Sequence, residues 1–282
     1  MIVTANIKLG LVTDVIPLNE IAPGWDYYEI PHAIHVVPLE SEANWRKNRE
    51  IYKASNVPTP VSSHYLLEPG QRYSDDFGLY ASGPDFDREQ QRFWAKRSFR
   101  RLNEIGVKVV GVYGAFFQRP DWYGRDNAID DALSFCNILA DEAEAYGMQI
   151  ALEPDADPET LFPTYKEGLA FAKATGRRSV KVMADLNYFL RINQSLDDIR
   201  EDPTYCLHVH MAGEGHGGGS QPNIGPRTEA FTKLFHILKD INYNGTVSAA
   251  CPWVSSTGSS DIDYKYETGL TLKYMRDLLA SS

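Results

Sequence analysis

Short apolar runs alternate with longer amphipathic stretches from one end of the chain to the other. Apolar runs of about 4–8 residues favour strands, and helical spacing of apolar residues favours helices. The predicted strands are residues 6–12, 26–30, 59–65, 107–113, 148–153, 179–185, 205–210 and 245–250. The predicted helices are residues 41–55, 87–105, 127–146, 162–175, 195–201, 226–240 and 264–280. Gly106 and Gly147 stand at the ends of two of these helices, where a C-terminal stop is expected.

Strands that alternate with helices predict a parallel sheet, and the number eight predicts its closure into a barrel. A doubly wound sheet is the rival interpretation, but no GxGxxG, GxxxxGKS or GxxxxGKT motif follows a strand. The glycine-rich stretch 216–219 has no lysine and no obvious helix start, so we interpret it as an active-site loop. The length of 282 residues suits one barrel. We therefore predict an α/β fold, a (β/α)8 TIM barrel with a single domain over residues 1–282.

Charge and composition exclude several classes of partner. A net charge of -10 argues against a protein that binds nucleic acid, because such binding requires Lys and Arg to neutralise phosphates. The sequence has no apolar run of about 18 residues for a membrane span, and its start lacks the basic region of a signal peptide. Cys136, Cys206 and Cys251 lie far apart and form neither a zinc knuckle nor a redox pair. We expect a cytoplasmic protein without nucleic-acid or membrane partners.

Three consecutive predicted strands end in a residue that suits a divalent metal ion: Glu153, Asp185 and His210. Strand ends meet at one mouth of a barrel, and a charge after an apolar strand is costly to bury unless it is paired or binds metal. Carboxylates with one imidazole suit Mn²⁺, Mg²⁺ or Co²⁺. Each residue has an alternative role as a helix cap or salt-bridge partner. His208 shares a strand face with His210, and either could be a core histidine.

The segment ALEPDADPE (151–159) resembles the LEP-x-x-x-x-E stretch of ketose 3-epimerases, within the xylose-isomerase-like TIM-barrel family of sugar phosphate isomerases and epimerases. The resemblance implies that Glu153 is a metal ligand and proton-transfer base and that Glu159 contacts the sugar substrate. It also implies that Asp185 and His210 are metal ligands. We expect one divalent ion, with Mn²⁺ favoured, and a homo-oligomer, either a dimer or a tetramer.

Three positions depart from the family pattern. Tyr188 stands where a His is frequent and His216 where an Arg is common, and we assign both to substrate binding. The last predicted strand reads Val-Ser-Ala-Ala-Cys where the family has approximately Val-Ser-x-Glu-Cys. The family Glu is the fourth ligand and second proton-transfer base, so Ala250 occupies a catalytic position without its carboxylate. A natural departure and an inactivating substitution both remain open.

Other candidates have a structural alternative of equal standing. His64 and Glu29 lie near strand ends and could contact substrate, or could serve packing or capping. The loop after residues 107–113 is rich in aromatic residues, namely Phe116, Phe117, Trp122 and Tyr123. Aromatic faces suit the apolar faces of a sugar, but they also form buried plugs. We assign Trp122 to substrate binding, while Trp253 keeps the same two interpretations.

These features predict a metal-dependent ketose isomerase or 3-epimerase that acts through an enediolate and is weakened by Ala250. One alternative is a metal-dependent lyase that cleaves 3-oxo-glycosides, and another is a catalytically silent sugar-binding barrel. The endonuclease-type branch of the fold uses a multi-zinc cluster and binds DNA. Seven histidines and a net charge of -10 argue against that branch.

Overall fold

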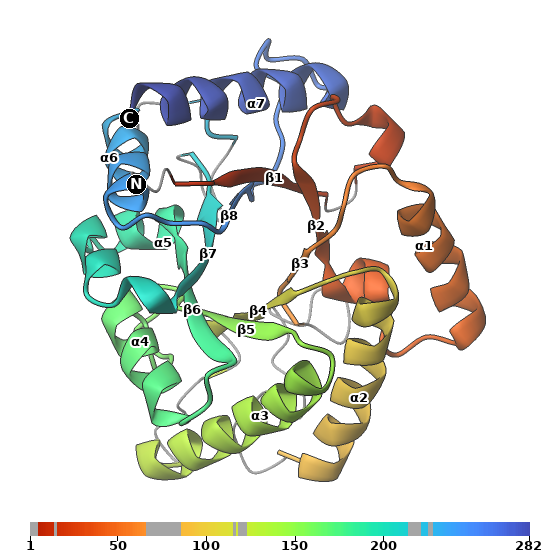
Figure 1. The fold of residues 1–282 in the computed structure, drawn as a ribbon, viewed down its shortest axis with the longest axis vertical. Helices are drawn as coiled ribbons and strands as arrows, with labels where there is room; N and C mark the ends of the chain where they lie inside the picture. The colour runs from red at the N-terminus through yellow and green to blue at the C-terminus, as the bar shows by residue number, and fades with distance from the viewer. Residues whose placement is uncertain are drawn as a thin grey trace. The chain divides into compact units, whose positions relative to one another are not determined.

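The computed structural model describes residues 5–13, 16–65, 86–114, 117, 123–213, 221–224 and 228–282. Eight parallel strands form a closed barrel in chain order from β1 to β8 (Figure 1). The strands are β1 (Lys8–Val12), β2 (Tyr27–Pro31), β3 (Val61–Ser63), β4 (Val109–Tyr113), β5 (Gln149–Glu153), β6 (Val180–Asp185), β7 (Cys206–Met211) and β8 (Thr246–Ala249). Each lies within one residue of, or inside, a predicted strand. The predicted (β/α)8 barrel is therefore confirmed.

The long predicted helices are also present, with small shifts at their ends. They are α1 (Glu42–Ala54), α2 (Arg88–Glu104), α3 (Arg125–Ala145), α4 (Tyr165–Ala174), α6 (Thr228–Asp240) and α7 (Tyr264–Ser281). The predicted helix 195–201 is the 3-10 helix Leu196–Arg200. Four short helical elements of the described residues were not predicted: α5 (Leu186–Arg191), the π-helix His32–Val36, and the 3-10 helices Leu18–Glu20 and Pro203–Tyr205. None is long enough to show helical periodicity in the sequence.

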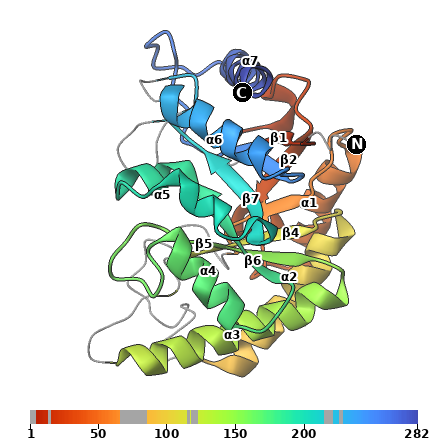
Figure 2. The same cartoon turned by 60° about the vertical axis from the view of Figure 1, so that its left-hand side comes forward.

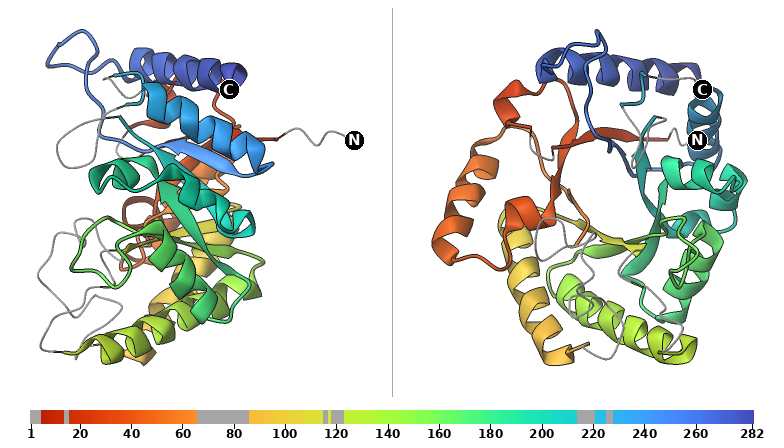
Figure 3. Two further views of the ribbon diagram at one scale, coloured as in Figure 1. Left: turned by 90° about the vertical axis from the view of Figure 1, so that its left-hand side faces the viewer. Right: turned by 180° about the vertical axis from the view of Figure 1, so that it is seen from behind.

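Contacts divide the chain into two compact units, one of residues 1–29 with 184–282 and one of residues 30–183. In the first unit β1 pairs with β2 and β8, β7 pairs with β8, and helices α6 and α7 pack side by side (Figure 2). In the second unit β3, β4, β5 and β6 pair in that order, and α2 packs along α3 (Figure 3). The single domain over residues 1–282 stays a prediction.

The core of the second unit includes an aromatic cluster that settles one alternative. The Phe117 ring is fully buried and contacts the rings of Phe135, Phe162 and Phe171 at centroid distances of 6.0, 4.8 and 5.8 Å. Phe117 is therefore a buried plug beside α3 and α4 rather than a face offered to a sugar. Among the helices of the described ranges, none is long and apolar enough to cross a membrane.

Candidate active site at the strand ends

A buried carboxylate joins β2 to β7. Glu29 of β2 is fully buried and accepts a hydrogen bond on each oxygen, from His208 Nε2 at 2.9 Å and from His210 Nε2 at 2.8 Å. Burial acts to raise the pKa of Glu29. The attraction of His210 and His208 and their hydrogen bonds outweigh it and hold that pKa well below its usual value. Glu29 is therefore an anion with both oxygens oriented by imidazoles.

His208 has a second fixed contact on β8. Its Nδ1 lies 2.7 Å from the Thr246 hydroxyl oxygen, and the two residues are direct partners in the β7–β8 register. Because strand side chains alternate between faces, His208 and His210 point to the same side of β7. Both imidazoles are buried, so the sequence alternative of a hydrogen-bonded core histidine describes His208 correctly.

Asp185 ends β6 and caps the helix that follows it. One carboxylate oxygen accepts a hydrogen bond from the Asn187 backbone N–H at 2.7 Å, which starts α5. The other oxygen lies 3.8 Å from His210 Nδ1. Asp185 therefore serves as the helix cap that was its alternative role, and its other oxygen also faces His210. Its role as a metal ligand stays a prediction.

The donor set in this unit suits a divalent metal ion. Two ligand atoms that each lie about 2.0–2.6 Å from one ion are roughly 3–4 Å apart. The 3.8 Å between Asp185 and His210 Nδ1 falls in this range and exceeds a hydrogen-bond length. Glu29, His208 and His210 also form a cluster whose ligand atoms lie within 4.8 Å of one another. The first unit thus contains a His/Glu cluster able to hold a metal ion.

The second unit contains its own carboxylate–imidazole pair. Glu153 ends β5, is fully buried, and accepts a hydrogen bond from His64 Nε2 at 2.6 Å. His64 directly follows β3 with a left-handed φ of 46°, and about a fifth of its side chain is exposed. The residue after β4 is Gly114, and its lack of a side chain lets the backbone pass close to Glu153, because a Cβ at Gly114 would lie 2.5 Å from the Glu153 carbonyl oxygen. His64, predicted as a substrate contact, therefore touches the predicted base.

The loop that follows Glu153 places a second acid nearby in the chain. Burial raises the pKa of Asp155 to about 6, although the Asp157 backbone N–H and the Thr160 hydroxyl donate hydrogen bonds to it. Glu159 is exposed in the same loop, and its backbone N–H donates to Asp157 at 3.0 Å. The exposed position of Glu159 is compatible with a contact to substrate, which stays a prediction.

The remaining predicted residues have varied positions. Tyr188 is half-buried in α5, and Ala250 is half-buried directly after β8, where its N–H donates to the Met211 carbonyl at 3.2 Å. The Tyr123 hydroxyl donates to Asp131 of α3 at 2.6 Å. The other predicted contacts, His216, Trp122 and Phe116, lie outside the described residues. A joint site of Glu153 with Asp185 and His210 stays a prediction, because Glu153 belongs to the other unit.

The sequence predicts Glu29 only as a possible substrate contact, yet the Glu29 carboxylate accepts hydrogen bonds from both histidines of β7. One signal was available in the sequence, since Glu29 is a charged residue between apolar neighbours in a short strand, YYEIP. Such a residue needs a buried partner.

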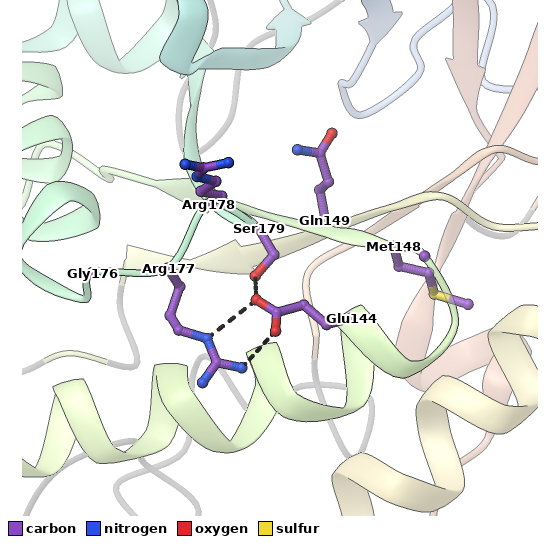
Figure 4. A pocket seen from close by; sticks show the side chains of 8 residues that line it. Glu144, Met148, Gln149, Gly176, Arg177, Arg178 and Ser179 are labelled. Atoms are coloured by element: carbon purple, nitrogen blue, oxygen red, sulfur yellow. Dashed lines mark hydrogen bonds and ion pairs between the residues drawn. The ribbon is translucent and has the colours of Figure 1, made fainter.

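A surface hollow marks the opposite ends of the strands in the second unit. It lies where β5 and β6 begin and is lined by Glu144, Gly147, Met148, Gln149, Gly176, Arg177, Arg178 and Ser179 (Figure 4). Arg177 donates to Glu144 and to Asp141, and the Ser179 hydroxyl donates to Glu144. These polar groups satisfy one another, which is typical of a stabilising cluster at the amino ends of barrel strands.

Comparisons with known proteins define the class to which this chain belongs. A family model described as Xylose isomerase-like TIM barrel matches residues 22–277. The chain therefore belongs to the xylose isomerase-like TIM barrel family, as the resemblance in its sequence implied. No curated protein sequence matches it.

Solved structures with the same fold include several sugar epimerases. D-psicose 3-epimerase with D-tagatose from Clostridium cellulolyticum is 18% identical, with a TM-score of 0.75 over 96% of this chain and 99% of the other. The 3-keto-D-glucoside 4-epimerase from E. coli is 18% identical, with a TM-score of 0.68 over 98% of both chains. The IOLI protein, solved with a zinc atom, is 14% identical, with a TM-score of 0.70 over 97% of this chain and 98% of the other. At these identities the likeness establishes the fold.

Proposed function

We propose that this chain is a divalent-metal-dependent ketose isomerase or 3-epimerase. The observation that carries the proposal is the placement of His210, with Nε2 on the Glu29 carboxylate and Nδ1 3.8 Å from Asp185. In the proposed site Asp185, His210 and Glu153 hold the ion, with Mn²⁺ favoured. A bound divalent ion would polarise the sugar carbonyl and stabilise the charge of an enediolate.

Glu153 is the proposed base that removes the proton beside the carbonyl. A base must be ionised, and a hydrogen bond donated to a carboxylate favours its charged form. His64 donates such a bond at 2.6 Å and fixes one carboxylate oxygen of the buried Glu153. Glu159, His216, Tyr188 and Trp122 are the proposed contacts to the sugar. The 3-epimerase among the structural neighbours supports this substrate class.

Ala250 favours a second candidate function. No carboxylate stands at this position to return a proton to the opposite face of the sugar. A 3-oxo-glycoside lyase needs only one base. That base removes the proton next to the 3-oxo group, a carbon–carbon double bond forms, and the aglycone leaves with the bonding pair. One structural neighbour is named as an epimerase of a 3-keto-glucoside, which makes this substrate class a reasonable test.

One experiment separates these candidates. The protein is stripped with a chelator, reloaded with Mn²⁺, and incubated in D₂O with a panel of ketoses and 3-keto-glycosides. Deuterium at a substrate carbon with an epimerised or isomerised product supports the proposal. Release of the aglycone supports the lyase. Sugar binding without deuterium exchange supports the silent sugar-binding barrel.

The control for this experiment is Asp185→Asn, which keeps the capping oxygen and removes the charge facing His210. It should bind Mn²⁺ weakly and lose exchange activity. Full exchange activity in metal-free protein, or in Asp185→Asn with Mn²⁺, would contradict the proposed function.

A further inference from the structure

We infer that Glu29 is a positioning residue that keeps the proton of His210 on Nε2, so that Nδ1 is the nitrogen that binds the metal ion. We infer also that His208 holds Glu29 in place for this task. The inference rests on the proposed function, because it concerns how this chain prepares a ligand. It assigns roles to two residues, Glu29 and His208, for which the resemblance in the sequence implies none.

The hydrogen bonds define the proton positions. An ionised carboxylate has only acceptors, so each imidazole nitrogen that bonds to it must carry a proton. His210 Nε2 lies 2.8 Å from Glu29 and is therefore a donor. A histidine binds a metal ion as a neutral ring with one protonated nitrogen, so a proton held on Nε2 leaves the lone pair of the metal-binding ring on Nδ1. That nitrogen is 3.8 Å from the Asp185 carboxylate.

The distances indicate whether Glu29 supports His210 through hydrogen bonds or binds the metal ion itself. The two contacts of Glu29 are 2.8 and 2.9 Å long, which is the length of charge-assisted N–H···O bonds. An ion placed between Glu29 and the histidines would have to replace both bonds. The separation of 3.8 Å between His210 Nδ1 and Asp185 is longer than a hydrogen bond, so an ion between these two atoms would not replace a hydrogen bond that joins them. The geometry therefore places Glu29 behind the ligand rather than on the metal.

His208 holds the Glu29 carboxylate in place from the side opposite to His210. Its Nε2 donates to the second oxygen of Glu29, and its Nδ1 lies 2.7 Å from the Thr246 hydroxyl. Glu29, His208 and His210 are each at most 1% exposed, so water does not compete for these bonds. A carboxylate behind a ligating histidine fixes the ring and its tautomer, and loss of such a partner typically costs about 10- to 100-fold in metal affinity.

The first test needs no variant. Histidine ¹⁵N NMR of the metal-free wild-type protein, at a pH high enough for the rings to be neutral, reports which nitrogen of each ring carries the proton. We expect His210 to carry its proton on Nε2 and to have an unprotonated Nδ1. A wild-type spectrum with the His210 proton on Nδ1 would overturn the inference directly, whatever the variants do.

The second test compares Mn²⁺ affinity by calorimetry in three Glu and His variants. In Glu29→Gln the amide has the same shape but can accept from only one imidazole. We expect about 10- to 100-fold weaker Mn²⁺ binding and a changed His210 tautomer. His208→Gln should give a smaller loss, because Glu29 still contacts His210.

The matched control is Glu267→Gln. Glu267 is also a buried carboxylate, 1% exposed, but its partners are Ser256 and Gln221 rather than histidines. It should keep the wild-type affinity and tautomer. Equal Mn²⁺ affinity in Glu29→Gln and wild type would overturn the inference alone. Abolished binding in His208→Gln would overturn it in favour of an ion inside the cluster. Absence of Mn²⁺ binding in the wild type would overturn the proposed function as well.

Discussion

The two ends of the barrel strands contain similar polar groups in opposite settings. Where β5 and β6 begin, Glu144 pairs with Arg177, and their side chains are 46% and 26% exposed. Toward the other end of β2 and β7, Glu29 is fully buried and its partners are imidazoles. A guanidinium is a permanent cation that cancels the carboxylate charge, whereas an imidazole is a cation only while both of its nitrogens are protonated.

This difference explains why one end suits a bound metal ion. At the amino ends, charge is balanced by protein groups and screened by water. At the carboxyl ends of the first unit, Glu29 is a buried anion and Asp185 adds a second carboxylate near His210. Buried negative charge without a fixed cation favours a bound divalent metal ion. Burial and the type of partner, rather than the residue types alone, should therefore distinguish the two ends.

The largest effect is expected from adding a carboxylate at each end. Ala250→Glu should raise Mn²⁺ affinity and increase solvent proton exchange into a ketose by about 10²- to 10⁴-fold, as expected of a general acid–base group. Gln149→Glu adds the same group beside the amino-end hollow at a similarly half-buried position. It should change neither quantity. If Ala250→Glu gains nothing while the wild type already turns over substrate well, another group is the second base and the lyase is favoured.

Breaking the pair at each end should lower the free energy of unfolding by different amounts. His210→Ala leaves one oxygen of the buried Glu29 without its hydrogen bond, and we expect a loss of about 3–5 kcal/mol in the free energy of unfolding. Glu144→Ala removes an exposed pair and should cost about 0–1 kcal/mol. Chemical denaturation of metal-free protein measures both. Equal losses would mean that burial does not distinguish the two clusters.

A smaller effect is expected at the exposed Glu159. Glu159→Ala should weaken sugar binding roughly tenfold, the value of one charge-assisted hydrogen bond, while metal content stays nearly unchanged. Substrate titration by calorimetry and metal analysis of the same samples provide the two readouts. Loss of metal together with sugar would show that Glu159 belongs to the metal site instead.

The smallest effect concerns acid stability at the amino ends. Hydrogen bonds from Ser179 and Arg177 hold the pKa of Glu144 below its usual value, against the effect of burial. Its contribution to stability is therefore present above the unfolded value of about 4.3 and is lost as pH falls through the lower folded value. Wild type should exceed Glu144→Gln by at most about 1 kcal/mol at neutral pH, with the difference vanishing in acid. A difference that grows as pH falls would contradict this sign.

The sequence by itself determined the barrel and the order of its elements. Strand and helix periodicities are local, so the eight strands and six long helices could be read from neighbouring residues. The same local pattern identified Glu153, Asp185 and His210 as polar residues at strand ends. The short helix α5 could not be predicted, because six residues contain too few turns to show a helical period.

Only the tertiary structure decided how these residues pair. Glu29 meets His208 and His210 across 179 and 181 residues of chain, and His64 meets Glu153 across 89. Phe117 was equally compatible with a sugar contact until its contacts showed a buried plug. Such pairings depend on the register of strands that are distant in sequence, and a period of two or 3.6 residues contains no information about register between them.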